Sequence, residues 1–206
     1  MGPPGVAAVK RLAADRQAWI CFADEAGQTL MPPKARTWAR RGCTPRLRIA
    51  ARGPDRISLA GLLAYRPGCR PRLMFRTLVV RNTRRPHKKS LLAPDLARML
   101  DTAHYRLGGA PIVLIWDNDS AHRSRVMQAL IAARPWLTVA PLPPYAPDLN
   151  PTESVWSHLK RSLANLAPCR IDELHTLVKT RLRHIQYRPA LLEAFLADTG
   201  LRLKPP

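Results

Sequence analysis

The feature of this sequence that most constrains its fold is a short apolar run, PIVLIW, at residues 111–116. The run is rich in β-branched residues and ends directly at the acidic sequence DND. A strand that is apolar at consecutive positions is buried on both faces of its sheet, so the run predicts a central strand.

The segments around this run predict an α/β fold with a mixed sheet. Several strands come first, then helices and strands alternate, and helices follow; no internal repeat or long linker divides the chain. We expect a basic N-terminal segment at residues 1–17 and one domain at 18–206, although the leucines of 56–66 leave a helix possible there. Strands are predicted at 18–25, 37–41, 56–66, 73–80 and 137–144, and helices at 5–17, 90–106, 120–135, 150–166, 170–185 and 189–198.

The charge balance indicates a polyanionic partner. The 206 residues include 34 Lys and Arg but only 14 Asp and Glu, a formal net charge of +20. Nucleic acid is the first candidate and an anionic membrane surface the second. No apolar run reaches membrane-spanning length, and the N-terminus lacks the apolar stretch of a signal peptide. Codon bias in a GC-rich genome would explain Arg in place of Lys, but not the shortage of acids.

The four cysteines indicate reduced thiols in a cytosolic protein. Cys21, Cys43, Cys69 and Cys169 are far apart, and no CxxC pair is present to suggest a zinc site.

Acidic residues follow two of the predicted strands. Asp24 and Glu25 end the first strand, and Asp117 and Asp119 end the central one. Sites collect at the carboxyl ends of strands in α/β sheets, so Asp24 and Asp117 lie side by side if the strands are neighbours. Two adjacent carboxylates repel, which a nearby Arg or a divalent cation such as Mg²⁺ or Mn²⁺ would relieve. Alternatively, these acids solvate loops, or Asp119 or Ser120 caps the next helix.

A proline-rich approach precedes another acid, Glu153. The sequence NPTE, residues 150–153, predicts a helix with Asn150 as N-cap, Pro151 in the first position and Glu153 in a capping box. Prolines at 141, 143, 144 and 147 stiffen the segment before it. Such rigidity exceeds what a cap requires and suits a side chain that must reach a metal accurately.

Four segments resemble the catalytic domain of DDE transposases, specifically the bacterial insertion-sequence relatives of the mariner superfamily. They are FADEAG (22–27), WARRGCTP (38–45), IWDNDSAH (115–122) and LPPYAPDLNPTESVW (142–156). The most specific pieces are P-Y-x-P-x-L-N-P-x-E-x-x-W and D-N-x-x-x-H, with 35 residues between Asp117 and Glu153. The similarity extends over about residues 18–165.

The resemblance implies a ribonuclease H-like fold and a catalytic triad of Asp24, Asp117 and Glu153. These carboxylates would hold two Mg²⁺ ions, with Mn²⁺ as a substitute and Asp24 bridging both. One ion would activate a water or a DNA 3′-hydroxyl, and the other would stabilise the leaving oxygen. The activity implied is DNA cleavage and strand transfer, with Asn118 and His122 contacting the metal ligands or DNA.

Basic segments near the expected site predict contacts to the DNA backbone. For any single Arg, a solvated loop is the plainer interpretation. Trp38 is expected to pack in the core rather than to stack on a base. Trp156 is expected to pack beneath its own helix. His122 is expected to form a structural hydrogen bond rather than to bind Mg²⁺. The candidate DNA contacts are Lys34, Arg36, Arg40, Arg41, Arg84, Arg85, Lys88, Lys89, His122, Lys160 and Arg161.

The similarity leaves no room for the N-terminal helix-turn-helix modules that family members carry, because the first acid is already at position 24. We expect this chain to be a separately encoded catalytic half, a fragment of a decayed copy or the downstream product of a frameshifted gene. The expected protein partners are a separately encoded helix-turn-helix DNA-binding subunit and a second copy of the chain in a homodimer. The expected location is the bacterial cytoplasm, at the nucleoid. The alternatives are a ribonuclease H-like nuclease without strand transfer and an inactive nucleic-acid-binding remnant.

Overall fold

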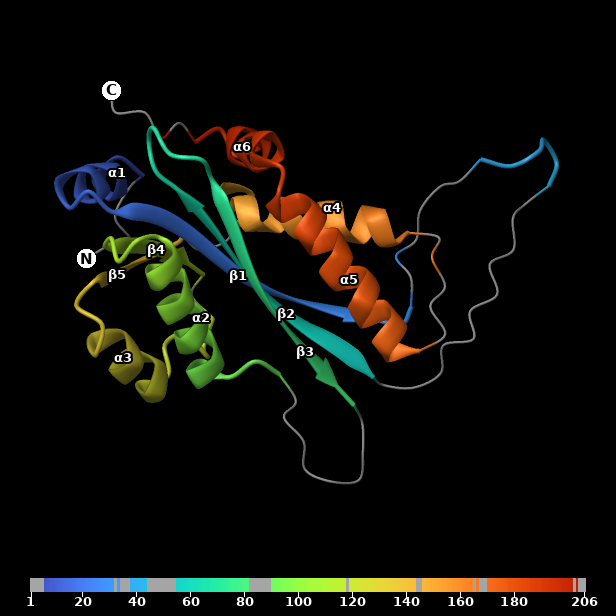
Figure 1. Ribbon diagram of the computed structural model, residues 1–206, viewed down its shortest axis with the longest axis horizontal. Helices are drawn as coiled ribbons and strands as arrows, with labels where there is room; N and C mark the ends of the chain where they lie inside the picture. The colour runs from blue at the N-terminus through green and yellow to red at the C-terminus, as the bar shows by residue number, and fades with distance from the viewer. Residues whose placement is uncertain are drawn as a thin grey trace.

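A five-stranded sheet with helices on both faces forms the structure, a computed structural model (Figure 1). It describes residues 6–31, 33, 38–43, 55–81, 90–117, 119–143, 146–164, 166, 170–201 and 203. The strands are β1 (Trp19–Thr29), β2 (Arg56–Tyr65), β3 (Arg72–Val80), β4 (Ile112–Trp116) and β5 (Leu137–Pro141). The helices are α1 (Val6–Asp15), α2 (Ala93–Arg106), α3 (Arg125–Ala132), the 3₁₀ turn η1 (Pro147–Leu149), α4 (Pro151–Leu163), α5 (Ile171–Gln186) and α6 (Pro189–Asp198).

The sheet is mixed, as predicted, with the strand order β3-β2-β1-β4-β5. β1, β2 and β3 pair antiparallel, whereas β4 pairs parallel with both β1 and β5. The apolar run at 111–116 therefore forms an interior strand, with Ile112, Val113 and Leu114 fully buried.

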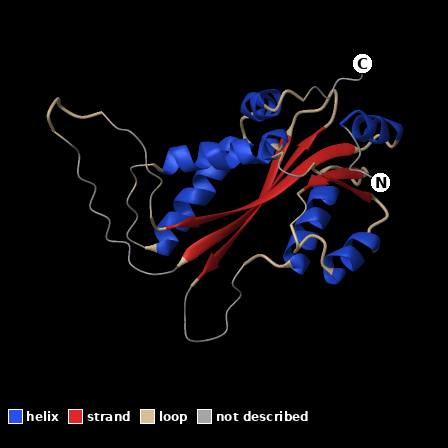
Figure 2. Ribbon diagram, turned by 180° about the vertical axis from the view of Figure 1, so that it is seen from behind, coloured by secondary structure: helices blue, strands red, loops and turns tan. Residues whose placement is uncertain are grey.

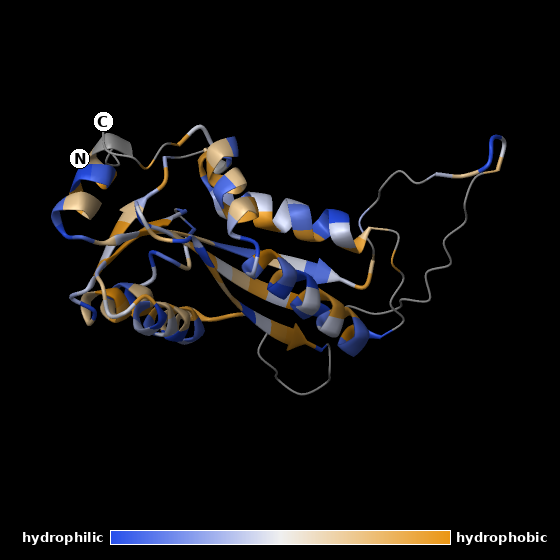
Figure 3. Cartoon of the chain, turned by 45° about the horizontal axis from the view of Figure 1, so that its top comes forward, coloured by the Kyte–Doolittle hydropathy of each residue, from blue (hydrophilic) through white to orange (hydrophobic). Residues whose placement is uncertain are grey.

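Successive residues of each strand point to opposite faces, which gives the sheet two apolar layers. Ile20 and Phe22 pack with residues of α1, α4, α5 and α6, whereas Cys21 and Trp116 pack with residues of α2 and α3. Figure 2 shows helices on both sides of the sheet. In Figure 3 the helices carry both hydrophobic and hydrophilic residues, as helices lying between a core and solvent do.

β1 is longer than predicted, and its length shapes the site. It pairs with β4 only over Trp19–Phe22, but with β2 as far as Thr29 opposite Arg56. Beyond Phe22, the edge of β1 that faces β4 has no strand partner among the described residues. Asp24 therefore lies on the part of β1 that extends beyond its pairing with β4.

Three predictions of local structure are wrong. Residues 38–43 contain no strand, and Trp38 is completely exposed instead of packing in the core. The cap of α3 is Ser124, whose hydroxyl accepts a hydrogen bond from the amide of Met127, rather than Asp119 or Ser120. Residues 119–124 form turns before that helix, so it begins later than the sequence pattern indicated.

The other predicted helices and strands are present, with ends shifted by a few residues. Cys21, Cys43 and Cys69 are free thiols, while Cys169 lies outside the described residues. None of the described helices combines the length and the hydrophobicity needed to span a membrane.

Candidate active site

The first two predicted acids lie at the same level of neighbouring parallel strands. Phe22 of β1 pairs with Ile115 of β4, and Asp24 and Asp117 each follow two residues later. Asp24 shares the face of Phe22, which α4 covers, whereas Asp117 follows the end of β4 and contacts His122, which stacks on Trp116 of the other face. The predicted adjacency of the two strands is confirmed.

The N-terminus of α4 is tied to β1 just before Asp24. Asn150 accepts a hydrogen bond from the amide of Thr152 at 3.1 Å and so caps the helix as predicted. Its Nδ2 also donates to the carbonyl of Ala23 at 3.1 Å, and the hydroxyl of Thr152 donates to the carbonyl of Phe22 at 3.0 Å. The cap residue and its neighbour thus fix the first turn of α4, which carries Glu153, against the strand that carries Asp24.

Trp156 adds a third connection between α4 and β1. Its indole Nε1 donates to Oδ2 of Asp24 at 2.8 Å, and its side chain is almost fully buried. The ring lies over Gly61, the residue of β2 that pairs with Asp24. A Cβ at Gly61 would lie 2.8 Å and 2.9 Å from Cζ2 and Cη2 of Trp156, so only glycine permits this approach.

Asp24 is strongly perturbed by these surroundings. Burial, followed by the negative charge of Glu153, raises the pKa of Asp24 to about 7. Glu25 contributes a smaller increase, while the hydrogen bond from Trp156 acts in the opposite direction. In the described part of the chain, no Lys or Arg forms an ion pair with Asp24 or Glu153. Two carboxylates thus lie near each other, and no cationic side chain of the described residues neutralises them.

Asp117 is held by a buried histidine. His122 Nδ1 lies 2.7 Å from Asp117 Oδ1, and Nε2 lies 3.2 Å from Oε2 of Glu25. The imidazole stacks on Trp116 with ring centroids 3.7 Å apart. Burial opposes protonation of His122, but the hydrogen bond and charge of Glu25, together with the charge of Asp117, outweigh it and raise the pKa.

Only 7% of the His122 side chain is exposed, which favours a structural role over the predicted DNA contact. The structural hydrogen bond expected as the alternative is present. Glu25, which sequence reasoning left without a role, orients this histidine. Asp119 accepts a hydrogen bond from the amide of Ala121 at 2.7 Å, which lowers its pKa and stabilises the turn after β4.

The family model for the DDE superfamily endonuclease matches residues 19–175, which span all five strands, α4 and the start of α5. The chain belongs to the DDE superfamily of endonucleases. No curated protein matches its sequence.

Solved structures show that this DDE endonuclease shares the fold of Mos1 transposase. The Mos1 strand transfer complex superposes with a TM-score of 0.54 at 14% identity, covering 98% of this chain and 65% of that one. The mariner Mos1 paired-end complex with Mg superposes with a TM-score of 0.57 at 16% identity, covering 94% of this chain and 59% of that one. The Mos1 catalytic domain superposes with a TM-score of 0.51 at 14% identity, covering 93% of this chain and 90% of that one. The chain thus spans less than two thirds of the longer Mos1 chains, and the predicted ribonuclease H-like fold is confirmed.

The carboxylates of this DDE endonuclease fit a hard divalent cation in donor chemistry. Asp24 and Glu153 repel each other, and the described contacts of Asp117 engage Oδ1, which leaves Oδ2 available as a ligand. Carboxylate oxygens are the donors that Mg²⁺ and Mn²⁺ prefer. The three side chains do not converge, however: across the described residues, no group of three or more His, Cys, Asp or Glu is arranged to hold a metal ion.

The predicted DNA-contacting residues of the endonuclease fall into two sets. Arg40, Arg41, Lys160 and Arg161 are exposed, the last two on α4 about two turns beyond Glu153. Lys34, Arg36, Arg84, Arg85, Lys88 and Lys89 lie outside the described residues, as does Asn118.

Proposed function

We propose that this chain is the catalytic domain of a transposase that cleaves DNA and joins the cut ends to target DNA. Asp24, Asp117 and Glu153 would carry the reaction. One observation carries the proposal: the tethered N-terminus of α4 brings Glu153 close enough to Asp24 to raise its pKa, with no cationic side chain in the described structure to relieve the repulsion. Stability alone would not select such an arrangement.

The three carboxylates would hold Mg²⁺, with Mn²⁺ as a substitute. Divalent ions bound there supply Lewis-acid activation of a nucleophilic oxygen and charge stabilisation of the leaving oxygen. Support comes from the donor chemistry of Asp24 and Glu153, and from the fold shared with Mos1 paired-end complexes that contain Mg or Mn.

The remaining side chains of the site position these ligands. Trp156 donates a hydrogen bond to Oδ2 of Asp24 and so restricts the orientation of that carboxylate. His122 holds Oδ1 of Asp117, and Glu25 orients that histidine from the other side. Cleavage requires each carboxylate to be placed within a small error; these contacts would hold Asp24 and Asp117, and the bound ion would draw the three carboxylates together.

DNA binding is proposed to use Arg40, Arg41, Lys160 and Arg161, with further basic residues outside the described part of the chain. A protein of net charge +20 binds the phosphate backbone strongly without reading sequence. End recognition would fall to a helix-turn-helix subunit, and two copies would pair two DNA ends. The enzyme would act at the nucleoid, in the bacterial cytoplasm.

A plasmid nicking assay tests the proposal. Supercoiled DNA should be nicked in Mg²⁺ or Mn²⁺, but not in Ca²⁺, and Asp24→Asn, Asp117→Asn and Glu153→Gln should each abolish nicking. Asp15→Asn, an exposed acid on α1, is the matched control and should nick normally. Unchanged nicking by Asp117→Asn would refute the site.

Strand transfer is tested with a pre-cut donor end. The transposase should join the 3′-hydroxyl of that end to target DNA, again with loss in Asp117→Asn. Nicking without joining would instead identify a nuclease that shares the fold.

A further inference from the structure

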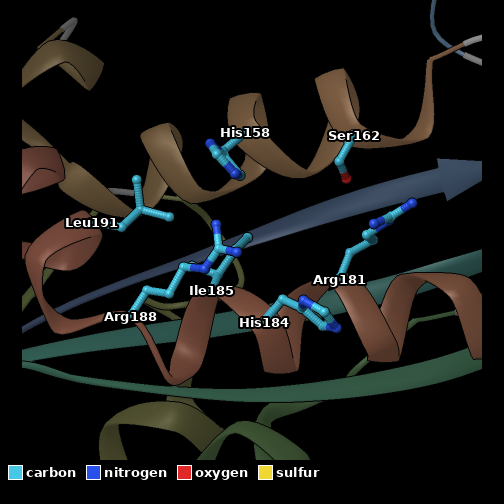
Figure 4. Close-up of a pocket in the computed structure, with 7 residues that line it drawn as sticks. All are labelled: His158, Ser162, Arg181, His184, Ile185, Arg188 and Leu191. Carbon is cyan, nitrogen blue, oxygen red and sulfur yellow. The ribbon is translucent and has the colours of Figure 1, made fainter.

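A basic pocket lies between α4 and α5, beside the start of α6 (Figure 4). Its volume is about 100 Å³, and its polar lining consists of His158, Ser162, Arg181, His184 and Arg188. Figure 4 shows His158 and Ser162 reaching down from α4, and Arg181 and Arg188 reaching up from the other wall. Two aliphatic side chains complete the pocket, and no acidic residue lines it.

Helix periodicity explains how these residues converge. His158 and Ser162 are four residues apart and share one flank of α4. Arg181 and His184 lie on one face of α5, and Arg188 continues that face at the N-cap of α6. His158 also packs edge-on against Phe195 with ring centroids 5.8 Å apart, which restricts its orientation. The pocket is thus built by fixed helices rather than by loops.

The charges of the pocket are not compensated within the described structure. Other arginines have acidic partners, such as Arg134 with Asp101 at 2.7 Å. Neither Arg181 nor Arg188 forms an ion pair with any described residue. Burial, followed by the positive charges of Arg161 and Arg188, lowers the pKa of His158. Converging cations without a counter-charge call for an anion.

The pocket lies away from the acidic site. On α4, Glu153 and His158 lie on opposite flanks of the apolar stripe that packs on the sheet. The outer surface of the helix between them carries Ser154, Ser157 and Arg161, and no acid interrupts it. The two positions differ by five residues, or about 7.5 Å along the axis, which is about two nucleotide steps at 3.4 Å each.

A second hollow adjoins the pocket and indicates the kind of anion. It has a volume of about 420 Å³ and is lined by Thr180, Arg183, His184, Tyr187 and Arg188, two of which it shares with the basic pocket. The side chain of Tyr187 is 79% exposed there, as expected of a platform on which a base can stack. A free inorganic anion would not need this extension, whereas a nucleotide would.

We propose that the basic pocket binds one backbone phosphate of DNA, on the opposite flank of α4 from the catalytic acids. Arg181 and Arg188 would neutralise the phosphate through charge-assisted hydrogen bonds. The attached nucleotide would occupy the adjoining hollow beside Tyr187. This inference rests on the proposed function, since it assumes a DNA substrate, and it adds an anchor for DNA outside the reaction centre.

The test is DNA affinity as a function of salt, measured by fluorescence anisotropy in Ca²⁺. The double variant Arg181→Gln/Arg188→Gln should bind more weakly, and its slope of log K against log salt should be shallower by about 0.9, the value for one phosphate on duplex DNA. The control Arg11→Gln/Arg106→Gln removes the same charge from exposed positions on α1 and α2 and should leave the slope unchanged. Equal slopes in both double variants would overturn the proposal.

Nuclear magnetic resonance of the histidine rings gives a second readout. Inorganic phosphate and a short oligonucleotide should both shift the His158 and His184 signals, but not that of His104, which stacks on Trp136 on the other face. The shifts should be absent in the Arg181→Gln/Arg188→Gln variant. Shifts caused by inorganic phosphate but not by the oligonucleotide would show a free-anion site and overturn the DNA assignment.

The two proposals fail in distinguishable ways. If the pocket is wrong, the Arg181→Gln/Arg188→Gln variant binds DNA as the wild type does, while Asp117→Asn still abolishes nicking. If the proposed function is wrong, nicking is absent or independent of Asp117, while DNA affinity still depends on the two arginines. Matching thermal unfolding of the variants and the wild type establishes that the fold is intact.

Discussion

Replacing Gly61 with alanine should disable the active site without touching an acidic residue. Gly61 lies on β2 opposite Asp24, under the ring of Trp156. An added Cβ would lie 2.8 Å and 2.9 Å from two ring carbons and 3.3 Å from Cγ2 of Thr152. All three contacts belong to the first two turns of α4, which also carry Glu153.

The geometry sets the size of the effect. Ordinary carbon contacts begin near 3.4 Å, so the indole must retreat by at least about 0.5 Å. Overpacking of this kind costs about 1–3 kcal/mol of folding free energy. The retreat also stretches the 2.8 Å hydrogen bond from Trp156 to Asp24. Since a misplacement of about 1 Å can reduce catalysis by about 100-fold, nicking should fall by roughly 10- to 100-fold.

Nicking rates and urea unfolding of the same preparations provide the assay. Gly27→Ala is the matched control, because a Cβ at that position of β1 meets only the carbonyl of Ile57, at 4.0 Å. It should change neither nicking nor stability by a comparable amount. In the double variant Gly61→Ala/Trp156→Phe the smaller ring should relieve the clash and recover stability, but not activity, because the N–H donor is lost. Wild-type nicking by Gly61→Ala would refute the reasoning.

Three further results are expected. Because the pKa of Asp24 is raised to about 7, the folded state favours the protonated carboxyl group. This group stabilises the fold fully below about pH 4, and the stabilisation is lost as the pH rises through 7. Asp24→Asn should therefore be more stable than wild type in metal-free urea unfolding at pH 8, by an amount on the order of 3 kcal/mol. The difference should vanish near pH 4, and equal stability at pH 8 would contradict this prediction. Asn150→Ala removes both the helix cap and the hydrogen bond to Ala23, so the free energy of unfolding should fall by about 2–3 kcal/mol and the nicking rate should fall with it. A loss of less than about 0.5 kcal/mol would count against a stabilising role of this hydrogen bond. Glu25→Gln should lower the pKa of His122 in a nuclear magnetic resonance titration, because its hydrogen bond and charge raise that pKa, and an unchanged pKa would show that Glu25 does not orient the ring.

Local patterns in the sequence were sufficient for the layout of the fold. The run at 111–116 predicted an interior strand, because residues buried on both faces must all be apolar. Asn150 and Pro151 predicted the start of α4, because capping depends on neighbouring residues only. The prediction that Asp24 and Asp117 each follow a strand was made from the same kind of local pattern, and those two strands, β1 and β4, are neighbours.

Contacts between distant segments could not be predicted in the same way. The hydrogen bond from Trp156 to Asp24 joins residues 132 positions apart, and it depends on Gly61 from a third segment. The one sign of this contact in the sequence was a glycine within a predicted strand. The role of His122 depends equally on Glu25, nearly a hundred residues earlier in the chain. Trp38 shows the opposite error, since an aromatic side chain predicts burial but is fully exposed here.

The measurement that tests the central claim most directly is Mn²⁺ binding, followed by electron paramagnetic resonance in the absence of DNA. The claim is that Asp24, Asp117 and Glu153 together hold a divalent cation. The wild type and Asp15→Asn should bind Mn²⁺ alike, and Asp24→Asn, Asp117→Asn and Glu153→Gln should each weaken binding by at least about tenfold, as loss of a ligand does. Equal Mn²⁺ affinity in all five proteins would contradict the account.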